Sequence, residues 1–322
     1  MEGTQMKSRK RMMTLAAAGM SGVLLLSACG GNGEDLTGGS DDAGNGDAGT
    51  ADDLQDVNIA LIAWDEAIAV THMWEVILEE KGYNVEVTDV DVAPMYQGAA
   101  NGDVDLFLDT WLPNTHEQYW EDYGDQLEDL GSWYDNGILT LTVPTYMEDV
   151  NSIPDLLDHV DELDGRIVGI DPGAGLTDTT QNSAMPGYEL DDDFELVTSS
   201  SAAMLAELDS AIEDEEPIVV TLWRPHPAYA KHDLKDLEDP EGLMGDAETI
   251  HSIGRDGFVD DFPQLAGWIE GWTMSDEELA TLQEVTVGDD VTDAEAGARE
   301  WLSENTEFLE RTLGDDAEGL EF

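Results

Sequence analysis

The chain has 322 residues, of which 74 are acidic and 12 are basic, and 41% of its residues are hydrophobic. This hydrophobic content and nine tryptophans argue against a disordered acidic protein. The lack of a basic patch argues against nucleic acids and anionic membrane surfaces as partners. A large net charge repels the compact state, but at molar salt the Debye length falls to about 3 Å and screens most of that repulsion. The composition therefore indicates adaptation to brine.

The first 28 residues have the order of an export signal. Basic residues between Lys7 and Arg11 precede an apolar stretch, Met12–Leu26, that is too short to span a membrane comfortably. The following Leu-Ser-Ala-Cys-Gly resembles a bacterial lipobox, in which the cysteine receives lipid and becomes the mature N-terminus. We therefore expect a lipoprotein signal peptide over residues 1–28 and lipidation of Cys29. The alternatives are a plain signal peptide and a short anchor helix.

Residues 29–55 consist mostly of Gly, Asp, Asn, Ser and Thr, which is typical of a flexible acidic tether. The segment contains a formal G-x-G-x-x-G match at 44–49. Neither a strand pattern before it nor a helix pattern after it supports a nucleotide site.

From Val57 onward, strand and helix patterns alternate. Strands are predicted over 57–63, 83–90 and 104–109, and helices from an N-cap at Asp65 to Gly82 and from Pro94 to Gly102. Strands that alternate with helices indicate a parallel sheet with helices on its faces.

A second alternating set begins near Asp155, and the two sets are joined near 140–144. It contains helical patterns over 154–163 and 201–216, strand patterns over 166–170, 194–199 and 217–223, and a Gly-containing turn that leads from 171–178 into another helix. The chain then ends in two helices, for which we expect capping boxes of Ser275 with Glu278 and of Thr292 with Glu295.

These patterns predict an α/β fold of two lobes with a ligand cleft between them. We expect the first lobe to comprise 56–143 together with 250–313, and the second lobe to comprise 144–249. Residues 314–322 are expected to form an acidic tail.

Trp64, Trp111 and Trp223 are each expected just past the end of a strand. In open α/β sheets, ligands bind outside the carboxyl ends of the strands. Indole faces there are suited to a cation without N–H groups, and each desolvated contact contributes roughly 2 kcal/mol. Three contacts fall short of the roughly 8 kcal/mol that micromolar affinity requires, so a second anchor is needed. The alternative is that all three are core tryptophans.

Two other segments are candidates for that anchor. The turn over 171–176 follows a strand and opens a helix, where free N–H groups suit an anion. His116, after Trp111-Leu112-Pro113-Asn114-Thr115, is placed to donate a hydrogen bond to the same carboxylate. The alternatives are an ordinary tight turn and a polar surface histidine. No cofactor is indicated. The six-residue spacing of His226 and His232 is poor evidence for a metal site, so none is predicted.

Several segments resemble the glycine betaine/proline betaine substrate-binding proteins of ABC importers. They include ALIAWDEA, DLFLDTWLPNTH, GIDPGAGL and PIVVTLWRPHP, and the resemblance covers most of 57–313. It implies a two-lobed periplasmic-binding-protein fold of type II that closes on its ligand. It also implies that Trp64, Trp111 and Trp223 box the trimethylammonium group. The same resemblance implies that the ligand carboxylate meets His116 and the backbone amides of Gly175 and Leu176.

Two departures from the relatives leave the fine specificity open. Pro227 stands where some relatives carry an aromatic residue, and Tyr96 stands where some carry Trp.

The expected function is that of an extracytoplasmic receptor without catalytic residues, lipid-anchored to the outer face of the cell membrane. It would bind a small quaternary ammonium ligand, glycine betaine or proline betaine, and deliver it to an ABC permease subunit for osmoprotectant uptake. We expect a monomer. The alternatives are a choline or carnitine receptor, an exported hydrolase of a cationic substrate, and a structural surface lipoprotein.

Overall fold

The structure, a computed structural model, describes residues 55–322. The predicted signal peptide, the lipidation of Cys29 and the tether up to residue 54 lie outside the described residues. None of the helices within the described range is both long and apolar enough to cross a membrane.

One mixed sheet of nine strands runs through the described chain, in the order β2-β1-β3-β9-β4-β7-β5-β6, with β8 paired to β4. The parallel strands of its first half are β1 (Asp56–Leu61), β2 (Asn84–Asp89) and β3 (Leu106–Leu112). The antiparallel centre is formed by β4 (Leu127–Pro144) and β9 (Glu248–Arg255). The second half contains β5 (Arg166–Gly169), β6 (Glu195–Thr198), β7 (Val220–Arg224) and β8 (Leu234–Asp236).

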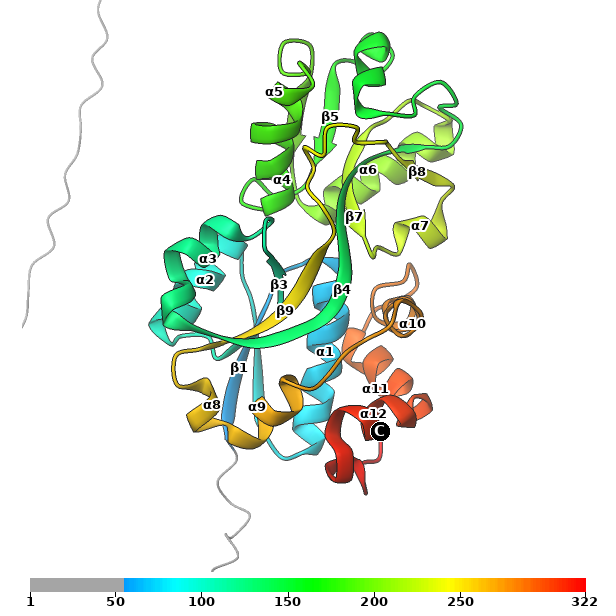
Figure 1. Ribbon diagram of the computed structural model, residues 1–322. Coiled ribbons are helices and arrows are strands. Elements are labelled where there is room, and N and C mark those ends of the chain that lie inside the picture. Colours follow the sequence, from blue (N-terminus) through cyan, green and yellow to red (C-terminus); the bar gives the residue numbers. More distant parts are fainter. Residues whose placement is uncertain (1–54) are drawn as a thin grey trace, which may run out of the picture. The chain divides into compact units, whose positions relative to one another are not determined.

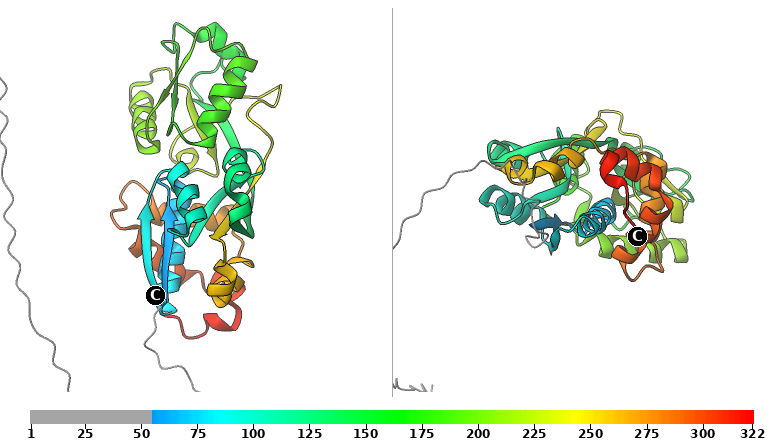
Figure 2. Two further views of the ribbon diagram at one scale, coloured as in Figure 1. Left: turned by 90° about the vertical axis from the view of Figure 1, so that its left-hand side faces the viewer. Right: turned by 90° about the horizontal axis from the view of Figure 1, so that it is seen from below.

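The predicted division into two lobes is visible in Figure 1 and in the side view of Figure 2. We call the body around β1, β2 and β3 the first lobe and the body around β5, β6 and β7 the second lobe. The long strand β4 belongs to both, because its first part pairs with β9 and its residues 138–142 pair with β7. The C-terminus lies in the first lobe, at the end away from the second (Figure 2).

Helix α1 (Asp65–Glu80) packs between the first-lobe sheet and two C-terminal helices, which explains why ten of its residues are buried. The other helices of this lobe are α2 (Val92–Asn101), α3 (Glu117–Tyr123), α8 (Phe258–Asp261), α9 (Pro263–Ile269), α10 (Asp276–Thr286), α11 (Ala294–Glu304) and α12 (Thr306–Leu313). Short 3-10 turns cover Gly124–Gln126 and Gly314–Ala317.

The second lobe carries α6 (Ser201–Asp214), α7 (Ala228–Lys231) and a helical segment in three parts. That segment consists of α4 (Gly175–Thr179), a π-helical turn (Thr180–Ala184) and α5 (Met185–Gly187). The helix predicted over 154–163 is instead a 3-10 helix, Ile153–His159, capped by Ser152.

Three details of the helix ends differ from the prediction. Asp65 is the first residue of α1, and Trp64 occupies the N-cap position. The capping box of Ser275 and Glu278 is confirmed, but α11 is capped by Asp293, whose carboxylate accepts the Ala296 N–H at 3.0 Å. Asp is a strong N-cap residue and stands one position after Thr292, so the helix begins one residue later. A third C-terminal helix, α12, follows after Asn305.

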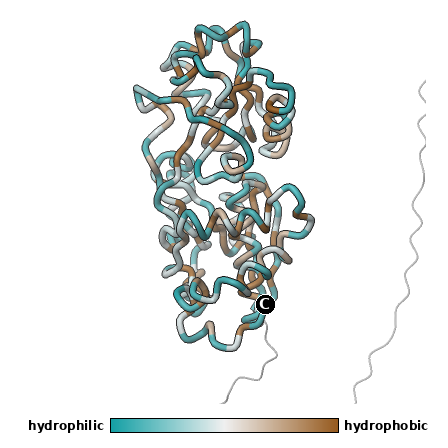
Figure 3. Tube along the Cα trace, turned by 90° about the vertical axis from the view of Figure 1, so that its right-hand side faces the viewer, coloured by the Kyte–Doolittle hydropathy of each residue, from teal (hydrophilic) through white to brown (hydrophobic). Residues whose placement is uncertain are grey.

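Hydrophobic residues concentrate on the inner strands and helices, and hydrophilic residues line the outer loops (Figure 3).

Acidic residues greatly outnumber basic residues in the chain. Four of the 12 basic residues and one of the 74 acidic residues precede Cys29, which leaves 8 basic and 73 acidic residues from there on. Ion pairs with carboxylates engage six of those eight: Arg166, Arg224, Lys231, Arg255, Arg299 and Arg311.

Candidate functional site

A small, partly open cavity lies where the two lobes meet, a place where small-molecule sites commonly form. Its lining comes from both halves of the sheet and includes all six ligand-binding residues predicted from the sequence. The lining residues are Trp64, Glu66, Trp111, Thr115, His116, Leu139, Ile170, Ala174, Gly175, Leu176 and Trp223.

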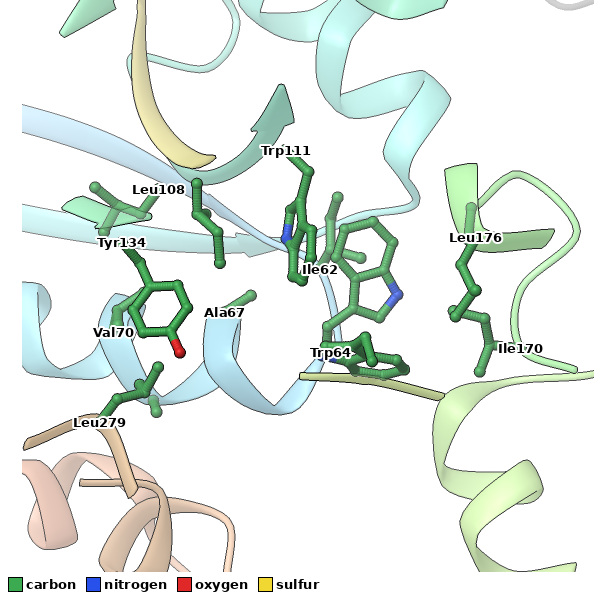
Figure 4. Packing of buried hydrophobic residues seen from close by; sticks show 14 of the residues in the cluster. Ile62, Trp64, Ala67, Val70, Leu108, Trp111, Tyr134, Ile170, Leu176 and Leu279 are labelled. Carbon is green, nitrogen blue, oxygen red and sulfur yellow. The ribbon is translucent and has the colours of Figure 1, made fainter. Parts of the chain in front are cut away.

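The three predicted cage tryptophans are brought together by separate elements. Trp64 follows β1 as the N-cap of α1, whereas Trp111 and Trp223 are the penultimate residues of β3 and β7. The last two therefore lie within their strands and not past the strand ends. All three side chains are buried, with exposed fractions of 3–5%. Figure 4 shows the rings of Trp64 and Trp111 close together, with Ile170 and Leu176 of the second lobe facing Trp64.

Hydrogen bonds at the ring edges fix the orientation of two of these indoles. Nε1 of Trp111 donates to Asp109 Oδ1 at 3.1 Å, and Nε1 of Trp223 donates to Glu66 Oε2 at 2.8 Å. Gly137 of β4 leaves room for the Trp111 ring, because a Cβ at this position would lie 2.6 Å from it. With their N–H groups engaged at the edge, these rings leave their faces to attract an alkylated cation.

His116 provides a neutral hydrogen-bond donor. Its ring is fully buried and stacks on Trp64, with centroids 5.7 Å apart. Nδ1 accepts the backbone N–H of Trp111 at 2.9 Å, so the proton of the neutral ring is on Nε2. Burial lowers the pKa of His116 to about 3, which keeps the ring neutral at physiological pH. Nε2 has no hydrogen-bond partner among residues 55–322, and a buried polar group in that state costs about 1–3 kcal/mol. The cavity therefore contains an N–H that lacks an acceptor.

The first residues of α4 form the opposite wall of the cavity. Ala174 is the N-cap, and the first N–H groups of a helix have no partner within it. Gly175 is required here because a Cβ would lie 2.0 Å from the carbonyl oxygen of Thr115 in the first lobe. Close by, the Tyr119 hydroxyl donates to the Gly173 carbonyl at 2.8 Å. The lobes are thus in direct contact around this end of the cavity.

Two buried carboxyl groups at the site were not identified from the sequence. Glu66 and Asp109 have exposed fractions of 1% and 0%. Burial, followed by the charge of Asp109, raises the pKa of Glu66 well above its usual range. Burial also raises the pKa of Asp109 to about 7, although the Trp111 hydrogen bond opposes this shift. Acidic residues are so abundant in the sequence that this pair could not be distinguished from the others. Each of the two nevertheless lies two positions from a predicted cage tryptophan, Trp64 or Trp111.

The two positions that depart from the relatives lie outside the cavity lining. Tyr96 is fully buried behind the site, where its hydroxyl donates to Thr110 Oγ1 at 3.0 Å and its ring stacks on Tyr119. Pro227 is the N-cap of α7.

The two histidines considered for a metal each lie beside a carboxylate. Nε2 of His226 lies 3.1 Å from Asp65, and Nε2 of His232 lies 2.6 Å from Asp209. In the described part of the chain, no group of three or more His, Cys, Asp or Glu residues is arranged to hold a metal ion.

Comparisons of sequence find one matching family and a curated relative. The family described as the substrate binding domain of ABC-type glycine betaine transport systems matches residues 55–304. The glycine betaine/carnitine transport binding protein GbuC of Listeria monocytogenes is 39% identical over 164 residues, which are 48% of this chain and 54% of that protein. The matched region thus spans about half the length of this curated relative.

Three solved structures are similar in fold and sequence. The glycine/betaine/L-proline-binding protein ProX of Borrelia burgdorferi is 32% identical with a TM-score of 0.77, covering 82% of this chain and 98% of that one. Lactococcal OpuAC, closed on glycine betaine, is 32% identical with a TM-score of 0.73, covering 79% and 97%. An ABC-transporter choline-binding protein in complex with choline is 27% identical with a TM-score of 0.74, covering 81% and 92%.

Proposed function

We propose, from the premise that this chain belongs to the family of substrate-binding domains of ABC-type glycine betaine transport systems, that its cavity binds glycine betaine or proline betaine. The two-lobed periplasmic-binding-protein fold expected from the sequence is the fold that it shares with solved members. In this proposal the indoles of Trp64, Trp111 and Trp223 surround the quaternary ammonium group. The carboxylate accepts hydrogen bonds from His116 Nε2 and from the amides of Gly175 and Leu176.

The observation that carries this proposal is the buried N–H of His116, which opens into an aromatic cavity without an acceptor. A betaine supplies a methylated cation for the rings and a carboxylate for this donor. Choline has no carboxylate, and its hydroxyl oxygen is a neutral and weaker acceptor, so its complex would lose a charge-assisted hydrogen bond worth about 1.5–3 kcal/mol. Carnitine carries both charges but is bulkier, and it is the second candidate because the name of the Listeria relative includes it.

Membership of this family supports a biological role. We propose an extracytoplasmic receptor, lipid-anchored through Cys29, that delivers its ligand to an ABC permease and does not transform it. The lobes predicted as 56–143 with 250–313 and as 144–249 would be the bodies that close. Contacts such as Lys231 Nζ to Asp289 Oδ1, 2.8 Å apart, would accompany the closed state.

Calorimetric titration in molar salt tests the ligand assignment. Glycine betaine, proline betaine, carnitine and choline are titrated into the same preparation of the chain without its signal peptide. We expect the two betaines to bind at least about tenfold more tightly than choline, which corresponds to roughly 1.4 kcal/mol. Equal or tighter binding of choline would show that the N–H of His116 does not select the ligand. Absence of binding by all four would overturn the proposed function.

A further inference from the structure

Glu66 and Asp109 share an arrangement that the proposed betaine contacts do not use. Each carboxylate accepts the indole N–H of one cage tryptophan, Trp223 for Glu66 and Trp111 for Asp109. Both are almost completely buried, and Glu66 also lines the cavity. Oδ2 of Asp109 has no hydrogen-bond partner in the described part of the chain.

Neither carboxylate has a basic partner. Across residues 55–322, no Lys, Arg or His lies within ion-pair distance of Glu66 or Asp109. Buried carboxylates that lack a partner are destabilised in their charged form, and a nearby cation favours that form. A ligand that brings a positive charge between the rings would supply what the two carboxylates lack.

The hydrogen bonds also connect the carboxylates with the rings. Neighbouring hydrogen bonds polarise one another inside a protein. A carboxylate that accepts from an indole N–H increases the electron density of the ring, and the negative ring face is what attracts a cation. With a cation between the rings, the acids would therefore act on it both directly, through the buried charge of Glu66, and through the rings of Trp111 and Trp223.

We propose that Glu66 and Asp109 form an anionic backing of the tryptophan cage, which makes the site select a positively charged head group over a neutral group of the same shape. The inference rests on the proposed function and adds to it a specificity device that is separate from the ring faces. Its rival is a positioning role alone, in which the carboxylates only hold the indoles in place.

The test compares glycine betaine with 3,3-dimethylbutanoate, in which carbon replaces the quaternary nitrogen. The two ligands share their shape and their carboxylate, so only the positive charge differs. Affinities are measured by calorimetry at pH 8 for the wild type, Glu66→Gln and Asp109→Asn, both of which retain a hydrogen-bond acceptor. Glu75→Gln is the matched control, because it removes one charge from the same helix outside the cavity lining.

We expect the wild type to prefer glycine betaine, and Glu66→Gln to reduce the ratio of the two affinities at least about tenfold. Asp109→Asn should reduce it less, because Asp109 is not part of the lining, and Glu75→Gln should leave it unchanged. If both ligands lose affinity equally in Glu66→Gln, the carboxylate only positions the ring and the proposal is wrong. If the wild type fails to bind glycine betaine, the proposed function itself is wrong.

A measurement on the wild type covers the case in which the variants do not fold. A cation between the rings lowers the pKa of both carboxyl groups, so glycine betaine should release protons near neutral pH, whereas 3,3-dimethylbutanoate should not. Titrations in two buffers of different ionisation enthalpy measure this release. The titratable groups around the pair are Asp65, Tyr96, His116 and His226, and the shared carboxylate of the two ligands affects them alike. Equal proton release with both ligands would overturn the proposal.

Discussion

The two ends of the cavity are built by different means. At the end proposed to bind the cation, which we call the cation end, large side chains from β3, β7 and the start of α1 present ring faces, and two buried carboxyl groups accept hydrogen bonds from two of these rings. At the other end the donors are a neutral imidazole and the backbone at the start of α4. No Lys or Arg is among the residues that line the cavity.

This difference is instructive in a chain with 73 acidic and 8 basic residues from Cys29 onward. A lysine or arginine in the cleft would form ion pairs with the surrounding carboxylates, which would then compete with the ligand carboxylate for that basic side chain. A neutral N–H attracts those carboxylates much less, so it remains available to the ligand. In the proposed complex, both ends would also rely on desolvated contacts, which salt screens much less than exposed charge pairs. The following predictions ask whether the two ends depend on separate features.

The largest effect is expected from Gly175→Ala, which acts on the end proposed to bind the ligand carboxylate. The added Cβ would meet the Thr115 carbonyl of the other lobe at 2.0 Å, so the lobes must separate. Strain of about 3 kcal/mol or more corresponds to roughly a hundredfold loss of betaine affinity. The fold of each lobe should persist, because Ala is favourable in a helix. Calorimetry measures the affinity, and Gly267→Ala, whose Cβ meets nothing within 4 Å, is the matched control. Wild-type affinity in Gly175→Ala would contradict the close approach.

Trp111→Ala acts on the cation end and should have the second largest effect. Removal of one desolvated ring contact, worth about 2 kcal/mol, should weaken glycine betaine roughly thirtyfold. The same truncation removes a buried aromatic side chain, so the thermal unfolding curve must show that the variant is folded. Trp111→Phe keeps a ring and should retain part of the affinity. Unchanged affinity of the folded Trp111→Ala variant, measured by calorimetry, would refute the cage assignment.

His116→Phe should separate the two ends most clearly. The substitution keeps an aromatic ring against Trp64 but removes the Nε2–H donor. Loss of one hydrogen bond to a charged group, about 1.5 kcal/mol or more, predicts roughly a tenfold weaker affinity for glycine betaine. The affinity for choline should change little, because choline has no carboxylate. Competition titration gives both values, and an equal loss for both ligands would mean that the substitution has disturbed the cage.

The gathering of Trp64, Trp111 and Trp223 around one cavity could be predicted from the sequence for a physical reason. Tryptophan is rare enough that three of them at predicted strand ends are unlikely to coincide by chance, and parallel strands bring such positions to one edge of the sheet. The same argument pointed to His116 and to the turn before α4, because both come after predicted strands. Here the local pattern of the chain and its chemistry point to one place.

Other parts of the site depend on contacts that no local pattern reports. Glu66 and Asp109 are two of 74 acidic residues, and only tertiary burial distinguishes them. Leu139 enters the cavity because β4 continues from one lobe to the other. That length was not predicted, because register irregularities between Asp129 and Gly137 break the alternation of the strand. Strand β9 pairs only with distant segments, β3 and β4, and was not predicted either.

A smaller effect is expected when the stability of the unliganded protein is measured against pH, because burial destabilises the charged form of Asp109. The pKa of Asp109 is raised from 3.8 to about 7 by burial, so folding favours its protonated form. Its contribution to stability is complete below pH 3.8 and is lost as the pH rises through about 7. Asp109→Asn carries no charge at any pH, so its melting temperature relative to the wild type should rise between pH 5 and pH 8. The exposed Asp192→Asn serves as the control. A constant difference for Asp109→Asn would contradict the raised pKa.

Salt should have the smallest effect on the affinity and a clear effect on the fold. The surface repulsion among acidic side chains is screened as the Debye length shortens from about 10 Å at 0.1 M to about 3 Å at 1 M salt. We therefore expect the melting temperature to rise with salt over this range. Betaine affinity should change by less than about threefold, because the proposed contacts, which are ring faces, a neutral imidazole and backbone amides, contain no exposed ion pair to screen. Thermal unfolding and calorimetry on one salt series measure the two quantities. A falling melting temperature would contradict the adaptation to brine, whereas a steep loss of affinity would show that an exposed charge holds the ligand.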